Sequence, residues 1–264
     1  MDKIMYIKIF QISLLVYFGF TALIFIFHRS MIYYPNSIKS DFYDCPAFDD
    51  SQKINTNGTR AYYKHSGDSI VVVYNGNAGS ACDRSYLKSI FKDHGYSYLF
   101  VEYAGYGGDK KKPSRDLLFK DAENITAFLM TKNYRRVLLF AESIGSGIAS
   151  YHTTLMPIDR ILFISPFDSL VNVAKTKFPI YPMFLLEKFS KENYNNIALL
   201  RDYEGDLRII HGTKDKIIPF KHGRALFENI NISNKELIII DGAGHNDIYN
   251  FEKTWKSISD FLQI

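Results

Sequence analysis

The longest apolar segment of the chain is an uncharged run in residues 9–27, IFQISLLVYFGFTALIFIF. Its length is close to the ~20 residues that a helix needs to cross the hydrocarbon core of a bilayer. The apolar region of a cleaved signal peptide is shorter and ends in small residues, whereas this run ends in Phe25, Ile26 and Phe27. We therefore predict a membrane-anchoring helix within residues 1–29, with a cleaved signal peptide as the alternative.

Basic residues flank both ends of this apolar run. Lys3 and Lys8 precede it, and Arg29 and Lys39 follow it. An excess of lysine and arginine marks the cytoplasmic end of a membrane span, so this balance selects no orientation. The prediction is a single-pass membrane protein whose domain lies on an undetermined side of the membrane.

Short apolar runs recur along the rest of the chain. They are rich in β-branched and aromatic residues and show no alternation with polar residues. Such runs are typical of strands that are buried on both faces of a parallel sheet. The expected strands cover residues 70–74, 98–101, 137–140, 161–164, 207–210 and 237–240.

Segments of helical character separate these runs. In residues 114–131 the apolar side chains recur at spacings of three and four, as an amphipathic helix requires, and Ser114 is placed to cap it. Strands and helices that alternate over this length predict an open, mostly parallel α/β sheet flanked by helices. The other expected helices cover residues 84–92, 144–155, 221–229 and 247–262.

One interval interrupts this alternation. Residues 166–206 contain no strand candidate, include Pro179 and Pro182, and are rich in Phe, Leu and Tyr. We expect a small cap over the carboxyl ends of the strands, where open sheets bind their ligands. The predicted organisation is a membrane anchor in residues 1–29, a connector in residues 30–61, and one α/β domain in residues 62–264 that includes the cap.

The composition fits one compact domain with a sizeable core. The chain has 264 residues, of which 47% are hydrophobic and 16% aromatic. The net charge of +4 arises from basic residues that are scattered along the chain, so we expect no nucleic-acid partner. Cys45 and Cys82 allow at most one disulfide and form no CxxC pair, so they do not indicate a thiolate metal site.

A serine stands where the expected strand of residues 137–140 turns into a helix. The sequence there reads Ala141-Glu142-Ser143-Ile144-Gly145. In a nucleophile elbow the serine has a strained backbone, so small residues must lie on either side of it. Ala141 and Gly145 meet this requirement, with Ala141 in the place of the first glycine of GxSxG. Ser143 is therefore the candidate nucleophile.

Such a serine needs a base that an acid orients, and in proteins with this elbow both follow the serine along the chain. His245 lies in a glycine-containing loop directly after the last expected strand, so it is the candidate base. Asp215 follows the preceding strand, which brings it beside that loop, so it is the candidate acid, with Asp247 as a possible neighbour. We expect packing, surface or structural roles for His152, His211 and His222.

Acyl transfer also needs donors aimed at the developing oxyanion. The backbone N–H of Ile144 follows the serine at the start of a helix, where the helix dipole favours negative charge. The second donor should come from an early strand-to-helix loop. Residues 75–80 form such a small, glycine-rich loop, in which the N–H of Asn77 is our candidate. A plain tight turn is the alternative, because Asn-Gly is a strong turn pair.

Together these segments resemble the α/β-hydrolase superfamily, and within it the membrane-anchored serine hydrolases with an HGNAG-type loop. The resemblance implies a triad of Ser143, Asp215 and His245, and hydrolysis of carboxylic esters, thioesters or, less often, amides without metal or cofactor. Two positions depart from the family's pattern: Asn75 replaces histidine and Ala141 replaces glycine. The matching segments are residues 75–79, 105–107, 141–145, 165–170, 211–215 and 242–245.

We therefore expect a serine hydrolase that forms an acyl-enzyme. The apolar cap and the anchor favour small-molecule acyl esters or thioesters, including lipids and lipidated proteins, as substrates. Short-chain esterase, lipase and thioesterase activities remain open, as does the oligomeric state. A catalytically silent, membrane-tethered binding module and an aminopeptidase-like amide hydrolase are the alternatives from other classes.

Overall fold

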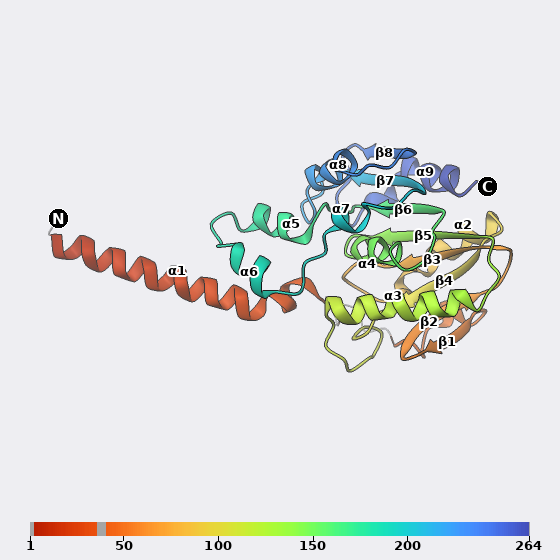
Figure 1. Cartoon of the computed structure of the whole chain (residues 1–264), viewed down its shortest axis with the longest axis horizontal. Coiled ribbons are helices and arrows are strands. Elements are labelled where there is room, and N and C mark those ends of the chain that lie inside the picture. The colour runs from red at the N-terminus through yellow and green to blue at the C-terminus, as the bar shows by residue number, and fades with distance from the viewer. Residues whose placement is uncertain (1–2, 36–40, 264) are drawn as a thin grey trace.

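A single eight-stranded sheet forms the centre of the molecule (Figure 1). The computed structural model describes residues 3–35 and 41–263. The strand order is β1-β2-β4-β3-β5-β6-β7-β8; β1 and β2 are antiparallel to their neighbours, and all other pairs are parallel. The strands are β1 Gln52–Thr56, β2 Thr59–Lys64, β3 Ser69–Tyr74, β4 Ser97–Glu102, β5 Arg136–Glu142, β6 Arg160–Ile164, β7 Asp206–Gly212 and β8 Lys235–Ile240.

The six strands expected from apolar runs are all present, as β3 to β8. Every residue of β3 and β4 is buried, because both strands lie inside the sheet with helices on each side. Continuous apolar sequence is what such a position requires. The prediction of a mostly parallel sheet flanked by helices is therefore confirmed.

The hairpin of β1 and β2 corrects the expected domain boundary. We expected residues 30–61 to be a connector and the domain to begin at residue 62, but that boundary falls inside β2, and the sheet begins at Gln52. The apolar pattern missed β1 because this edge strand is largely exposed and carries polar side chains. Asn57 and Gly58 form its turn, both with positive φ (51° and 90°), which is the conformation that a two-residue hairpin loop demands.

Helices cover both faces of the sheet. One face packs against α3, α4 and α8, and the other against η2, α2 and α9. The side chain of Ser114 accepts a hydrogen bond from Leu117 N at 3.3 Å, as expected for the cap of α3. The helices are α1 Lys3–Ile32, α2 Lys88–Asp93, α3 Arg115–Met130, α4 Gly145–His152, α5 Leu170–Lys177, α6 Phe184–Phe189, α7 Asn196–Leu199, α8 Phe220–Asn229 and α9 Glu252–Leu262, with short 3-10 helices η1 Pro46–Phe48, η2 Ala81–Leu87 and η3 Ile248–Asn250.

The cap consists of α5, α6 and α7, which lie between β6 and β7 in the chain. We expected the cap in residues 166–206; residues 166–205 contain no strand, and Asp206 is the first residue of β7. In Figure 1, α5 and α6 extend from the domain toward α1. The cap thus lies between the sheet and the N-terminal helix.

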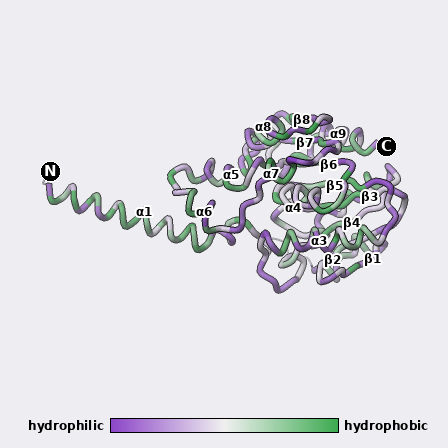
Figure 2. The backbone as a smooth tube through the Cα atoms, viewed as in Figure 1, coloured by the Kyte–Doolittle hydropathy of each residue, from purple (hydrophilic) through white to green (hydrophobic). Residues whose placement is uncertain are grey.

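The N-terminal helix α1 projects from the domain (Figure 1) and is hydrophobic over most of its length (Figure 2). Its 30 residues correspond to a length of about 45 Å. Only Thr21 and Ile24 are buried, so α1 is not a core helix. By length and composition it is a candidate membrane span, with a mean hydropathy of 2.2 over its most apolar window. Of the four flanking basic residues, Lys39 lies outside the described residues.

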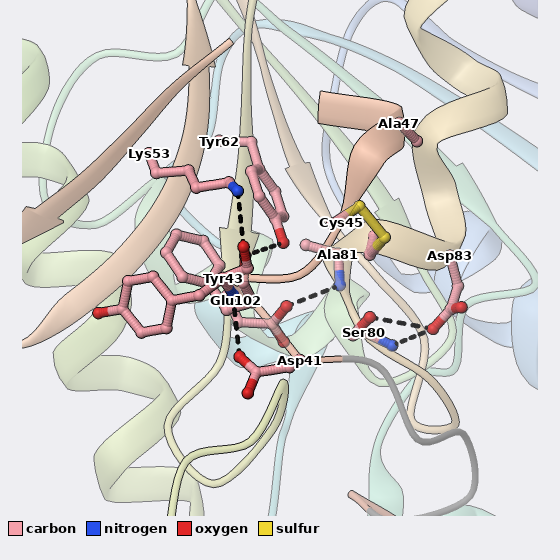
Figure 3. The surroundings of a disulfide bond; sticks show 12 residues. Asp41, Tyr43, Cys45, Ala47, Lys53, Tyr62, Ser80, Ala81, Asp83 and Glu102 are labelled. Carbon is pink, nitrogen blue, oxygen red and sulfur yellow. Dashed lines mark hydrogen bonds between the residues drawn. A yellow bond between two sulfur atoms is a disulfide. The ribbon is translucent and has the colours of Figure 1, made fainter. Parts of the chain in front are cut away.

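One disulfide ties the segment before β1 to the start of η2 (Figure 3). It joins Cys45 to Cys82, whose Cα atoms are 6.0 Å apart. Beside it, Ala81 N donates to Glu102 Oε2 at 3.2 Å. Burial raises the pKa of Glu102 to about 8. The disulfide fixes the start of η2, which carries two side chains of the site described next.

Candidate active site

Ser143 lies at a sharp turn between β5 and α4. Its φ is 51°, a left-handed conformation that is costly for a residue with a side chain. Two residues later a side chain could not be accommodated, because a Cβ on Gly145 would lie 2.3 Å from the carbonyl oxygen of Tyr74. Ala141, which departs from the usual glycine, fits as a fully buried residue of β5. The backbone is therefore that of a nucleophile elbow.

The structure brings Ser143, His245 and Asp215 into one hydrogen-bonded row. His245 Nε2 lies 3.1 Å from Ser143 Oγ. On the other side of the ring, His245 Nδ1 lies 2.6 Å from Asp215 Oδ2. These residues follow β5, β8 and β7, whose carboxyl ends meet at one edge of the sheet. We call this row the Ser143 relay.

The carboxylate of Asp215 is held by its own loop as well as by His245. Oδ1 accepts hydrogen bonds from the backbone N–H groups of Ile217 and Ile218, both at 2.8 Å. His211 Nε2 lies 3.3 Å from Oδ2 and also 2.9 Å from the carbonyl of Ile218. His211 thus supports the loop that presents Asp215, which is the structural role expected from the sequence.

This environment keeps Asp215 ionised. Burial is the largest single influence and favours the neutral acid, but hydrogen bonds from His211 and His245 outweigh it and hold the pKa of Asp215 well below its ordinary value. Asp247, the alternative neighbour, instead accepts a hydrogen bond from Gly244 N at 2.6 Å. Asp247 therefore shapes the loop of His245, whereas Asp215 contacts the imidazole.

The two candidate oxyanion donors line the same cavity as Ser143. The backbone N–H groups of Asn77 and Ile144 donate to no other residue among those described. The side-chain oxygen of Asn77 accepts from Tyr34 N at 3.0 Å and from the Tyr106 hydroxyl at 2.9 Å. These bonds fix the loop after β3 beside the serine.

A cavity of about 690 Å³ opens over Ser143. One wall is polar and was missed by the sequence analysis. Arg84 Nε lies 2.6 Å from Glu142 Oε2, and the hydroxyls of Tyr86 and Tyr249 donate to Glu142 Oε1. The position of Glu142 directly before the serine is a signal that could have placed it here, whereas Arg84, Tyr86 and Tyr249 come from segments whose approach only the fold reveals.

A second part of the cavity lining, which we call the apolar wall, is apolar. It is formed by the cap, by the last turn of α1 and by the loop after Asp215. The apolar residues of this wall are Met31, Ile32, Phe167, Leu170, Val173, Ala174, Phe178, Ile217 and Ile218. The end of α1, which was predicted as a membrane anchor, thus also contributes to the cavity.

A second row of hydroxyl, imidazole and carboxylate lies outside the cavity. His222 Nδ1 lies 2.8 Å from Asp168 Oδ1, and His222 Nε2 lies 3.0 Å from Thr176 Oγ1. We call this row the Thr176 relay. The remaining candidate, His152, is fully buried between Tyr74 and Thr126, and burial lowers its pKa to about 3.

Among residues 3–35 and 41–263, no group of three or more His, Cys, Asp or Glu side chains is arranged to hold a metal ion.

Comparison with known proteins gives several relatives, while no family model matches the chain. Protein Rv2307c of Mycobacterium tuberculosis is 30% identical over 230 residues, covering 83% of this chain and 80% of that protein. The membrane protein YNL320W of Saccharomyces cerevisiae is 28% identical over 202 residues (74% of this chain, 70% of that protein). The human alpha/beta hydrolase domain-containing protein 17B is 28% identical over 194 residues (70% and 64%).

Solved structures share the architecture. The esterase Pf2001 of Pyrococcus furiosus superposes with a TM-score of 0.64 at 19% identity, covering 81% of this chain and 89% of that one. The esterase Est2 of Thermogutta terrifontis gives a TM-score of 0.65 at 16% identity, covering 82% and 93%. At these identities the likeness concerns the fold.

Proposed function

The chain belongs to the α/β-hydrolase superfamily, in one family with protein Rv2307c, and from this premise we propose that it is a serine hydrolase of carboxylic esters or thioesters. The observation that carries the proposal is the Ser143 relay at the elbow, with 3.1 Å from serine to imidazole and 2.6 Å from imidazole to carboxylate. A silent binding module would have no need to hold a strained serine against a base.

In the first half of the proposed reaction, Ser143 Oγ attacks the carbonyl carbon while His245 Nε2 takes the hydroxyl proton. Asp215, ionised by its hydrogen bonds, stabilises the imidazolium that forms. The tetrahedral intermediate collapses when the bond to the leaving oxygen or sulfur breaks and His245 returns the proton to that atom. Water then repeats the sequence on the acyl-enzyme and releases a carboxylic acid.

The negative oxygen of the tetrahedral intermediate needs fixed donors. The backbone N–H groups of Ile144 and Asn77 are assigned to this role, since both line the cavity beside Ser143 and neither donates elsewhere in the described chain. The start of α4 at Ile144 adds the favourable end of a helix dipole. Each such donor contributes on the order of 10²-fold to the rate.

The two walls of the cavity suggest how an ester is oriented. An acyl chain suits the apolar wall, which includes Leu170, Val173 and Phe178. The leaving group then faces the polar wall around Arg84 and Glu142. A volume of about 690 Å³ is within the usual range for ligand cavities and accommodates a chain longer than acetate.

A fluorophosphonate probe tests this proposal. We expect the probe to modify the wild type once, on Ser143, and to leave Ser143→Ala unmodified. Ser165→Ala is the matched control, because Ser165 also lines the cavity and also has a positive φ (49°), but its hydroxyl has no partner in the described chain. It should be modified like the wild type. A folded wild type that the probe leaves unmodified would contradict the proposal and favour a binding module.

The enzyme is proposed to be anchored by α1 with its domain on an oxidising side of a membrane. The disulfide of Cys45 and Cys82 supports this side, since disulfides persist outside the reducing cytosol. Treating sealed membranes with protease tests it. The domain should be digested from the side away from the cytosol, and digestion only from the cytosolic side would contradict the assignment.

A further inference from the structure

The cap packs along α1 through a series of contacts that begins with polar pairs. Nearest the domain, Arg29 Nε lies 3.2 Å from Glu192 Oε1. One residue earlier on α1, His28 Nε2 lies 2.9 Å from Ser190 Oγ. These charged and polar partners need an aqueous or headgroup environment. They mark the level at which α1 leaves the apolar part of a bilayer.

Farther along α1 the contacts become apolar. Ile24 packs with Tyr181 and Met183 in a small buried cluster. Still farther, the Tyr17 hydroxyl donates to the carbonyl of Ile180 at 3.1 Å. Residues 178–189, which we call the cap hairpin, therefore run down the side of α1 away from the domain (Figure 1).

The position of Tyr17 decides the environment of this hairpin. From His28 to Tyr17 a helix advances about 16 Å, close to half of the ~30 Å hydrocarbon thickness of a bilayer. Any stretch of about 20 residues within Lys3–Ile32 also contains Tyr17. If α1 crosses a membrane at all, the segment that bonds to Tyr17 lies in the membrane with it.

The composition of the cap hairpin suits that environment. Residues 178–186 of the hairpin, FPIYPMFLL, carry no charge, and its two charged residues, Glu187 and Lys188, lie at its end, shortly before the Ser190 that contacts His28. Three large apolar side chains project from the hairpin, with exposed fractions of 79% for Ile180, 61% for Phe184 and 59% for Phe189. In water such a group of side chains would be unfavourable. Hydrocarbon removes this cost.

Several polar groups of the hairpin are paired or absent, which lowers the cost of burying it in hydrocarbon, although the Tyr181 hydroxyl has no partner in the described chain. Pro179 and Pro182 have no N–H to satisfy. The N–H groups of Phe178 and Tyr181 donate to the carbonyls of Ala174 and Phe178, at 2.8 Å and 3.0 Å. The carbonyl of Ile180 and the hydroxyl of Tyr17 satisfy one another. Lys175 of α5 and Glu187 of α6 form an ion pair at 2.7 Å, so their charges compensate one another.

We propose that the cap hairpin inserts into the bilayer leaflet next to the domain and that the cavity receives its substrate from that leaflet. The second half of this inference rests on the proposed function. The hairpin and the cavity are contiguous, because Phe178 and Ala174 line the cavity and also pack against the cluster around Ile24. Met31 and Ile32, at the end of α1, line the cavity as well. The substrate class is an acyl ester or thioester whose chain resides in the bilayer.

Insertion is tested by fluorescence of the full-length protein in phosphatidylcholine vesicles whose acyl chains carry bromine, a short-range quencher. Phe184→Trp places a reporter on the hairpin, and Met130→Trp places one on a side chain that is 71% exposed at the far end of α3. The native Trp255 is present in both variants as a reference. We expect brominated lipid to reduce the added emission of Phe184→Trp and to leave that of Met130→Trp unchanged.

If brominated lipid does not reduce the emission of Phe184→Trp, insertion is contradicted. The hairpin would then contact water or a second copy of the chain. This measurement does not depend on catalysis, so its failure and the failure of the proposed function are separate results. Quenching of both reporters would also overturn the proposal, because it would show that the domain as a whole lies in the lipid.

Substrate entry is tested by comparing turnover of a long-chain ester held in vesicles with turnover of water-soluble p-nitrophenyl acetate. Ile180→Asp places a charge in the hydrocarbon, so we expect the ratio of the two rates to fall about tenfold or more. Met130→Asp is the control and should leave the ratio unchanged. An unaltered ratio in Ile180→Asp would overturn entry from the leaflet. If the wild type does not hydrolyse p-nitrophenyl acetate at all, the proposed function itself is contradicted.

Discussion

The Ser143 relay and the Thr176 relay have nearly the same geometry, yet we propose only the Ser143 relay as a reaction site. Their hydrogen-bond lengths are 3.1 and 2.6 Å in the first and 3.0 and 2.8 Å in the second. The carboxylates share an electrostatic character too. In both, burial favours the neutral acid, and hydrogen bonds that include one from the histidine outweigh it and lower the pKa of the carboxyl group.

The surroundings of the two hydroxyls differ. Ser143 sits at a strained elbow with φ of 51° and opens to a cavity. Thr176 lies within α5, where its hydroxyl also donates to the Asn172 carbonyl at 3.1 Å, and it does not line the cavity. The comparison teaches that a hydrogen-bonded row of hydroxyl, imidazole and carboxylate is not sufficient for a nucleophilic site. Such a site also needs access for the substrate, backbone donors for the oxyanion, and a hydroxyl that makes no other hydrogen bond as a donor.

The largest expected difference between the relays is in turnover when the histidine is removed. His245→Ala deprives the serine of its base, so we expect turnover of p-nitrophenyl butyrate to fall roughly 10⁴-fold or more. His222→Ala should change turnover per folded molecule by less than about threefold, since His222 touches no reacting atom. Steady-state assays with the folded fraction measured by circular dichroism make the comparison. Equal losses in both variants would contradict it.

Removal of the charge on the acid should give the next largest difference. Asp215→Asn retains the shape of the side chain but no longer stabilises the imidazolium, so kcat should fall about 10³- to 10⁴-fold. Asp168→Asn makes the same change in the Thr176 relay and should leave kcat nearly unchanged. A small effect of Asp215→Asn on kcat would show that another group orients His245.

Stability should show the opposite order. His222→Ala leaves the Asp168 carboxylate, which is 5% exposed, without its main partner, so we expect a loss of about 2–4 kcal/mol in the free energy of unfolding. His245→Ala also removes a partner from a buried carboxylate, but Asp215 keeps the N–H groups of Ile217 and Ile218 and the ring of His211, so this variant should cost less, about 1 kcal/mol. Denaturant titrations of both variants measure this difference. A larger loss for His245→Ala would reverse our assignment of the two relays.

The apolar wall beside Ser143, which the Thr176 relay lacks, should determine which acyl chains are accepted. Leu170→Trp narrows the cavity, so we expect kcat/KM for an octanoate ester to fall about tenfold relative to the acetate ester. Leu170→Ala widens the same place and should shift the preference toward longer chains. A series of p-nitrophenyl esters of graded length provides the measurement. An unchanged chain-length preference in both variants would contradict binding of the acyl chain at the apolar wall.

The smallest expected effect concerns pH. The pKa of Asp215 is lower in the folded than in the unfolded chain, so its contribution to stability is present above the unfolded pKa of about 3.9 and is lost as pH falls through the folded value. Asp215→Asn should therefore flatten the acid side of the stability profile by on the order of 1 kcal/mol. Thermal unfolding between pH 3 and 6 measures this change. A steeper acid side in the variant would contradict the sign.

Much of the fold and of the candidate site could be predicted from the sequence because local signals determine them. Continuous apolar runs indicate β3 to β8, since those strands are buried on both faces. Loop positions directly after strands brought together Ser143, Asp215 and His245, because parallel strands end at a common edge. The small residues Ala141 and Gly145 are also a local signal, because the tight turn at Ser143 leaves little space for side chains on either side of it.

The rest depends on how distant segments meet. β1 is an exposed edge strand with little apolar signal. Arg84 and Glu142 are paired at 2.6 Å although 58 residues separate them. The Thr176 relay and the contacts of the cap with α1 likewise join segments that only tertiary packing brings together. No spacing of residues along the chain predicts such contacts.

The central claim is that Ser143 forms an acyl-enzyme, and rapid quenching of the wild type during turnover of p-nitrophenyl butyrate tests it most directly. The quenched protein is digested and its peptides are analysed by mass spectrometry. We predict that one butyryl group is found, on the peptide that contains Ser143, and that it is absent from Ser143→Ala. Hydrolysis with the butyryl group on another residue, or hydrolysis that survives in Ser143→Ala, would contradict the account.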